Sequence, residues 1–111
     1  MVKLSTNDFA KNIIDTSVIS KIVKTLNIEI LENSIVKARV ILVDKSFIDV
    51  YYNHDNEKTS FALVRKDKRV FGADNLDFWH IHPFENPDEH KKSNAVSFAE
   101  FLKMVENNLT K

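Results

Sequence analysis

The spacing of apolar residues changes its period once along the chain, near residue 26. Over residues 18–26 the apolar side chains recur at helical spacing. Ser5 with Asp8 resembles a capping box, and a second helix start follows at Asp15. The sequence therefore predicts an N-terminal helical region, consisting either of two short helices or of one helix broken near Asp15.

After this point, apolar and polar residues alternate, which is typical of strands with one buried face. The predicted strands cover about residues 26–30, 35–43, 47–53, 59–65, 69–71 and 78–82, with residues 72–77 as a loop and 84–92 as an irregular polar segment. The connections are too short for a parallel return, which needs a dozen or more residues. The pattern thus predicts an antiparallel meander of five or six strands.

The C-terminal segment has the signals of an amphipathic helix. Ser97 and Glu100 form an S-x-x-E capping box, and an apolar stripe follows at helical spacing: Phe98, Phe101, Leu102, Val105 and Leu109. This helix should cover part of one sheet face, with the N-terminal helical region covering the rest. The prediction is a single α+β domain over residues 1–111.

Composition narrows the possible functions. The 111 residues include no cysteine, so disulfides, thiolate metal ligands and cysteine nucleophiles are excluded. One glycine is too few for a P-loop or a dinucleotide-binding turn. Sixteen basic and sixteen acidic residues cancel, so no overall field draws the protein to nucleic acid or membrane. Without a signal-like segment or an apolar run of roughly 18 residues, a cytoplasmic protein without membrane contact is expected.

Three of the four histidines, His80, His82 and His90, lie within eleven residues among several carboxylates. If residues 78–82 are extended, His80 and His82 project from the same face about 6.5–7 Å apart, and Trp79 and Ile81 face the core. Two such imidazoles could ligate a divalent metal such as zinc, with His90 or an acidic residue as third ligand. They could also act as a general acid and base. The third possibility is that His80 and His82 have a purely structural role, with His80 on a solvent-exposed face of the strand.

A basic turn precedes the histidines, with Arg65 and Arg69 on either side of Asp67. Its guanidinium groups could bind a phosphate or stabilise negative charge that develops on it. Alternatively, the basic residues only keep the hairpin tip in solvent and discourage aggregation at the sheet edge. Asp74, followed by Asn75, is a turn signal, and the aspartate could alternatively orient an imidazole.

Four stretches resemble the TumE-like toxins of prokaryotic toxin–antitoxin modules, and the resemblance spans about three quarters of the chain. They are ILVDKSFIDVYYN (41–53), TSFALVRKDKRVFGADN (59–75), WHIHPFENPDEH (79–90) and VSFAEFLKMVE (96–106). The resemblance implies a cytoplasmic prokaryotic protein encoded beside a small DNA-binding antitoxin, which would be its partner.

Three functional hypotheses follow. In the first, the protein is a metal-independent ribonuclease without a cofactor: His80 and His82 act as base and acid on RNA, Arg65 or Arg69 stabilises the transition state, and His90 assists. In the second, His80, His82 and His90 bind a divalent metal. In the third, the protein is a non-catalytic domain that binds a partner or forms a homodimer.

Overall fold

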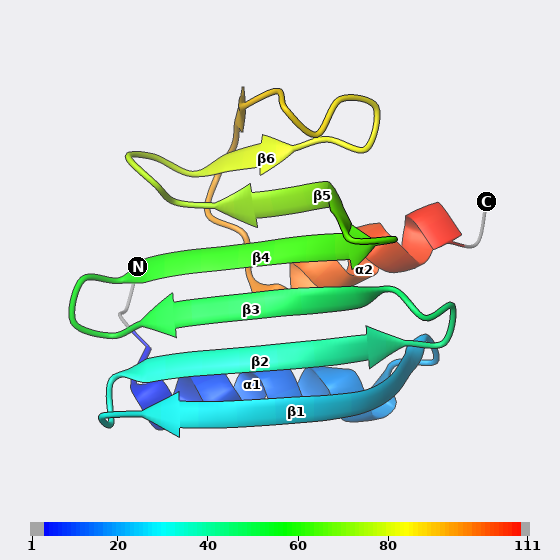
Figure 1. The fold of residues 1–111 in the computed structure, drawn as a ribbon. Coiled ribbons are helices and arrows are strands. Elements are labelled where there is room, and N and C mark those ends of the chain that lie inside the picture. The colour runs from blue at the N-terminus through cyan, green and yellow to red at the C-terminus, as the bar shows by residue number, and fades with distance from the viewer. Residues whose placement is uncertain (1–3, 110–111) are drawn as a thin grey trace.

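The computed structural model describes residues 4–109 and shows one antiparallel sheet with both helices on the same face (Figure 1). Seven strands follow one another across the sheet in chain order, each antiparallel to the next. The elements are α1 (Thr6–Ile19), β1 (Val23–Leu31), β2 (Ile35–Leu42), β3 (Phe47–Asn53), β4 (Lys58–Arg65), β5 (Lys68–Asp74), β6 (His80–His82), β7 (Lys91–Lys92) and α2 (Phe98–Leu109). The predicted α+β meander is confirmed, with the two-residue β7 as an additional strand.

The N-terminal region forms one continuous helix, so both predicted forms of it, two helices or a broken one, are wrong. Ser5 caps α1 by accepting a hydrogen bond from the backbone N–H of Asp8 at 3.0 Å. An ion pair between Lys11 and Asp15 at 2.8 Å spans the expected break. Residues 23–26, predicted as helical, begin β1 instead, because in extended form they pair with β2 and bury their apolar side chains against the core.

The sheet has a core face, covered by the helices, and an open face. On β2, for example, Val36 and Val40 are fully buried on the core face, whereas Lys37 and Arg39 lie on the open face. Arg39 pairs there with Asp49 of β3 at 2.9 Å. The strict alternation explains why these strands could be located from the sequence.

Strand β5 continues through Gly72 to Asp74, where a loop was predicted. Ala73 pairs with Phe61 of β4 on one side and with Ile81 of β6 on the other, and it is fully buried. Two strand neighbours therefore hold this segment extended despite its turn-like composition. As a result, Asp74 lies on the open face directly opposite His80.

Helix α2 begins with the predicted capping box. Ser97 Oγ accepts from the backbone N–H of Glu100 at 3.1 Å, and Glu100 Oε1 accepts from that of Ser97 at 2.9 Å. These hydrogen bonds hold the pKa of the Glu100 carboxyl below its usual value. The buried stripe packs on the core face: Phe98, Phe101, Leu102 and Val105.

Within residues 4–109, neither helix combines the length and the apolar character that crossing a membrane requires.

Candidate metal centre

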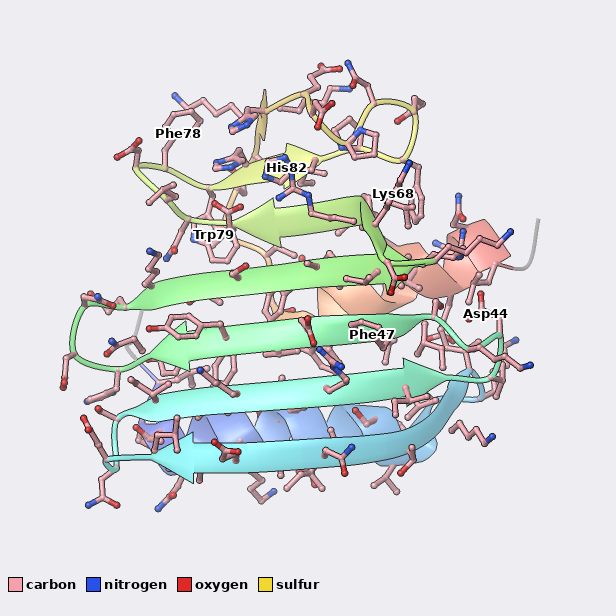
Figure 2. The ribbon with its side chains drawn as sticks, viewed as in Figure 1. Asp44, Phe47, Lys68, Phe78, Trp79 and His82 are labelled. Atoms are coloured by element: carbon pink, nitrogen blue, oxygen red, sulfur yellow. The ribbon has the colours of Figure 1, made fainter. Side chains whose placement is uncertain are left out.

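The site lies on the open face of the sheet, at its β5–β7 edge. His80 and His82 project together from β6, while Trp79 and Ile81 pack against the core (Figure 2). The predicted alternation from Trp79 to His82 is therefore confirmed, although the strand begins at His80 rather than at the predicted residue 78. The two imidazole rings are in edge contact, with their centroids 4.9 Å apart.

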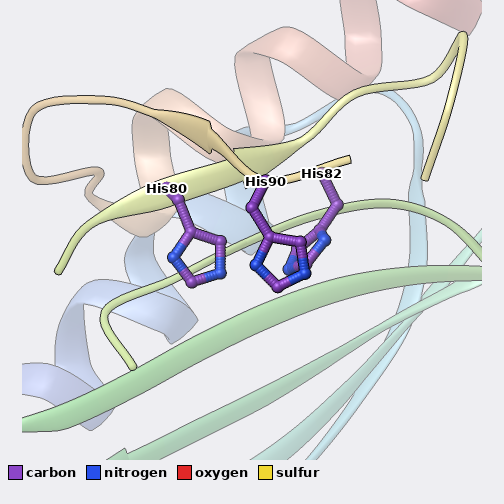
Figure 3. Close-up of side chains that lie close together, drawn as sticks. All are labelled: His80, His82 and His90. Carbon is purple, nitrogen blue, oxygen red and sulfur yellow. The ribbon is translucent and has the colours of Figure 1, made fainter. Parts of the chain in front are cut away.

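His90 completes a cluster of three rings, which we call the histidine cluster (Figure 3). The chain returns beside β6 because Ile81 pairs with Lys91 of β7, and this brings His90 over the strand histidines. The His90 ring stacks on His80 with centroids 4.7 Å apart and meets the edge of His82 at 4.6 Å. One nitrogen from each histidine lies within 4.8 Å of the other two. The three predicted ligands do converge.

Backbone carbonyls fix the tautomer of the two strand histidines. Nδ1 of His80 lies 2.9 Å from the Phe78 carbonyl oxygen, and Nδ1 of His82 lies 3.1 Å from that of Pro87. A carbonyl oxygen only accepts hydrogen bonds, so each Nδ1 must carry the proton. In the neutral rings, Nε2 then presents a lone pair, which is the form of histidine that ligates metals.

Both Nε2 atoms face the same carboxylate. Asp74 Oδ1 lies 3.1 Å from Nε2 of His80, and Oδ2 lies 3.1 Å from Nε2 of His82. Carboxylate oxygens repel imidazole lone pairs, so positive charge must lie between them, either as protons or as a metal ion. Ligands bonded at 2.0–2.1 Å to tetrahedral zinc are about 3.3 Å apart, close to the two 3.1 Å separations between Asp74 and the strand imidazoles. The three imidazole nitrogens, which lie within 4.8 Å of one another, would draw together around an ion. The structure supports both roles considered for Asp74: its carboxylate faces the two imidazoles, and its Oδ1 also accepts a hydrogen bond from the backbone N–H of Leu76 at 3.0 Å in the turn that follows β5.

The inner rings do not face an open cleft, as the sequence-based interpretation had assumed. His80 and His82 are each only 3% exposed, whereas His90 is exposed. The segment from Pro83 to His90 covers them, and the Pro87 carbonyl in this segment bonds to His82. This burial favours a small ion over a macromolecular substrate as the ligand of the inner rings.

The only glycine makes room for this arrangement. Gly72 is the cross-strand partner of His82. A Cβ atom on Gly72 would lie 3.2 Å from the Phe61 carbonyl oxygen, 3.3 Å from Cδ of Arg69 and 3.5 Å from Cδ2 of His82. A Cβ atom at this position would therefore crowd the backbone of β4 and the Arg69 side chain, and it would already be in van der Waals contact with His82.

Gly72→Val is expected to destabilise the protein by about 1–3 kcal/mol through overpacking. It should also weaken zinc binding about tenfold, because the γ-carbons of valine extend beyond a Cβ position that already contacts His82 and would displace this ligand. Zinc titration followed by calorimetry measures the second effect. Lys37→Val, on the open face of β2 and away from the cluster, is the control and should bind zinc like the wild type. Equal zinc affinity in Gly72→Val would contradict the proposed crowding.

The two candidate arginines occupy different surroundings. Nη2 of Arg69 donates to the Pro87 carbonyl oxygen at 3.2 Å, the same oxygen that accepts from His82. Arg69 therefore borders the histidine cluster. Arg65 instead pairs at 3.5 Å with Asp44, in the turn between β2 and β3, away from His82 on β6 (Figure 2).

The Arg65 side chain belongs to a structural cluster around Asp44. Partial burial raises the pKa of the Asp44 carboxyl, but the Ser46 hydroxyl and backbone N–H and the Arg65 charge together lower it below its usual value. The hydroxyl and the backbone N–H of Ser46 both donate to Asp44 Oδ1. The arrangement satisfies the hydrogen bonds of the turn and places Arg65 beside Asp44 rather than beside the histidine cluster, while Nε and Nη2 of Arg65 are buried without a hydrogen-bond partner among residues 4–109.

Asp44 should make stability depend on pH. Its folded pKa lies below the unfolded value of about 3.9, so between these values the unfolded state binds more protons. The stabilisation is complete above pH 4 and is lost as the pH falls through the folded pKa. The difference in urea midpoint between wild type and Asp44→Asn should therefore be largest at pH 7 and shrink below pH 4. A difference that stays constant from pH 7 to pH 2.5 would contradict this.

Two parts of the site could not be predicted from side chains in the sequence: the backbone carbonyls that bond to the imidazoles, and strand β7. The carbonyls of Phe78 and Pro87 act through the backbone, and β7 consists of two exposed lysines, Lys91 and Lys92, without an alternating pattern.

Compared with protein-family models, curated proteins and solved structures, the chain matches none.

Proposed function

We propose that this protein binds one divalent transition-metal ion, with zinc the best fit, through His80, His82 and His90 and with Asp74 as fourth ligand. One observation carries the proposal: both strand imidazoles direct Nε2 to a shared carboxylate while their Nδ1 protons are held by carbonyls. Such second hydrogen bonds to ligating histidines are a regular feature of metal sites.

The chemistry of the ligand set supports the choice of ion. Three imidazole nitrogens with one carboxylate oxygen suit zinc and neighbouring transition metals rather than magnesium or calcium, which prefer oxygen ligands. Four protein ligands fill a tetrahedral zinc ion, as in structural sites. The ion would join β5, β6 and the segment before β7, so we assign it the role of holding this edge of the sheet together.

The test is metal content and affinity. Purified protein, stripped with EDTA and dialysed against zinc, should retain one zinc per chain by elemental analysis. His80→Ala, His82→Ala and His90→Ala should each lose most of this zinc. His54→Ala is the matched control, because His54 lies outside the cluster, with Nδ1 3.0 Å from the Leu4 carbonyl oxygen.

His90→Ala is the sharpest of the three variants, because an exposed residue can be removed with little effect on folding. Circular dichroism checks that it stays folded. No zinc retained by the wild type, or equal losses in His90→Ala and His54→Ala, would overturn the proposal.

A second candidate is RNA cleavage by His80 and His82, in keeping with the TumE-like resemblance and its expected antitoxin partner. It is favoured by the position of Arg69 beside His82, where a cation could meet a phosphate. The wild type should then cleave RNA in the presence of EDTA. The His80→Ala/His82→Ala double variant should be at least about 10²-fold slower, since general acid–base catalysis contributes that much or more. Equal rates would exclude this candidate.

A further inference from the structure

Strand β1 leaves one side of its backbone without a strand partner. It is the first strand in the sheet, and among residues 4–109 it pairs only with β2 (Figure 1). It is also the longest strand, with nine residues, whereas β7 at the opposite edge has two. A long free edge is a template for another strand, and proteins that do not use it usually shorten or cover it.

Exposed apolar side chains gather beside this edge. Val18 of α1 is 75% exposed, and Ile14 of α1 and Ile30 of β1 are exposed as well. Asn12 lines the cavity between α1 and α2. At 100° per residue, Ile14 lies about 200° around α1 from Asn12, on the flank turned away from α2. The apolar flank of the helix and the free strand edge thus lie on the same side of the molecule.

The sequence of β1 fits a second copy of itself in antiparallel orientation. Its core face carries Leu26, Ile28 and Ile30, whose partners on β2 are buried. If two copies pair about a two-fold axis at Ile28, Ile28 meets its own copy and Leu26 meets Ile30 of the second copy. This is the register in which all three apolar residues face apolar partners.

The charges within β1 agree with the antiparallel orientation. Lys24 lies near the start of the strand, at the bulge between Val23 and Thr25, and Glu29 lies near its end. Antiparallel pairing places the basic end of each copy near the acidic end of the other. A parallel arrangement would instead bring like charges together.

We infer that the protein forms a symmetric homodimer through β1, in which two seven-stranded sheets join into one. The closed two-fold contact covers both free edges at once and brings the exposed flanks of the two α1 helices together. The inference is independent of the proposed metal site, which lies at the opposite edge of the sheet.

Light scattering after gel filtration gives the first test. The wild type should have twice the chain mass of 12.9 kDa, about 26 kDa, at high micromolar concentration. Ile30→Lys should give a monomer, because it buries charge in the apolar contact. Leu76→Lys is the control: Leu76 is also an exposed apolar residue, but it lies between β5 and β6 and should leave the dimer intact. A monomeric wild type at 100 µM, or a dimeric Ile30→Lys, would overturn the inference.

A charge exchange tests the orientation. Lys24→Glu should weaken the dimer about tenfold, since it gives the two adjoining ends of the paired strands the same charge. Adding Glu29→Lys to the same chain restores opposite charges at these ends and should restore the wild-type affinity. Circular dichroism confirms that each variant is folded. A double variant as weak as Lys24→Glu would exclude the antiparallel pairing.

Discussion

Replacing Phe101 with alanine is expected to lower the free energy of unfolding by about 3–5 kcal/mol, the usual cost of removing a large buried ring. Phe101 is fully buried on α2, and its ring centroid lies 5.4 Å from that of Phe61 and 5.1 Å from that of Phe71. Truncation would remove these contacts and leave a cavity between the helix and the sheet. A domain of this size has about 5–15 kcal/mol of stability, so the loss is a large fraction of the total.

The position of Phe101 in a series of aromatic contacts explains why its truncation should cost so much stability. Ring contacts run from Phe9 of α1 through Phe61 to Phe101, then to Phe71 and on to Phe84 at the start of the segment that covers the histidine cluster. Phe84 stacks on Phe71 with centroids 4.2 Å apart. The same core that joins the helices therefore also anchors the covering segment.

Urea unfolding at equilibrium measures the effect. Phe101→Ala should lower the midpoint while keeping the slope of the free energy against urea concentration. Lys103→Ala is the control on the same helix, since Lys103 is exposed and its loss should change stability by less than about 0.5 kcal/mol. A loss below 1 kcal/mol for Phe101→Ala would contradict the assigned packing.

The parts of the fold with strict alternation could be predicted from the sequence. The strand over Phe47–Asn53 has the predicted bounds, because its odd and even positions differ clearly in polarity and a polar turn lies at each end. The region around Val23 could not be assigned in this way. Ile22, Val23 and Leu26 satisfy the helical spacing, and a bulge between Val23 and Thr25 interrupts the strand alternation, so only pairing with β2 identifies this segment as a strand.

Part of the candidate site could also be predicted from the sequence. The shared face of His80 and His82 follows from alternation alone, and His90 was a candidate third ligand by its closeness in sequence. The role of Asp74 toward the imidazoles was obscured because Asp74 and Asn75 signal a turn, which does follow β5, whereas pairing on both sides extends the strand up to Asp74. The burial of the inner rings depends on the segment that covers them, whose path has no periodic signal.

Zinc at about 100 times its dissociation constant is expected to raise the free energy of unfolding by about 2.7 kcal/mol, since it binds the folded state. For a chain of this length, the thermal midpoint should rise by roughly 10 °C. The expectation follows from the distribution of the ligands: Asp74 lies on β5, His80 and His82 on β6, and His90 just before β7. The unfolded chain brings together only the two nearest histidines, so it should bind the ion much more weakly.

Thermal unfolding with and without zinc, monitored by circular dichroism, distinguishes a specific site from general ion effects. His90→Ala should keep a midpoint close to that of the metal-free wild type but lose most of the shift caused by zinc, because one ligand is missing while the inner packing remains. His54→Ala, which leaves the cluster intact, should retain the full shift. If zinc left the wild-type midpoint unchanged, or raised it equally in His90→Ala, the ion would not be linking these strands, and the protons shared among His80, His82 and Asp74 would alone account for their close contacts.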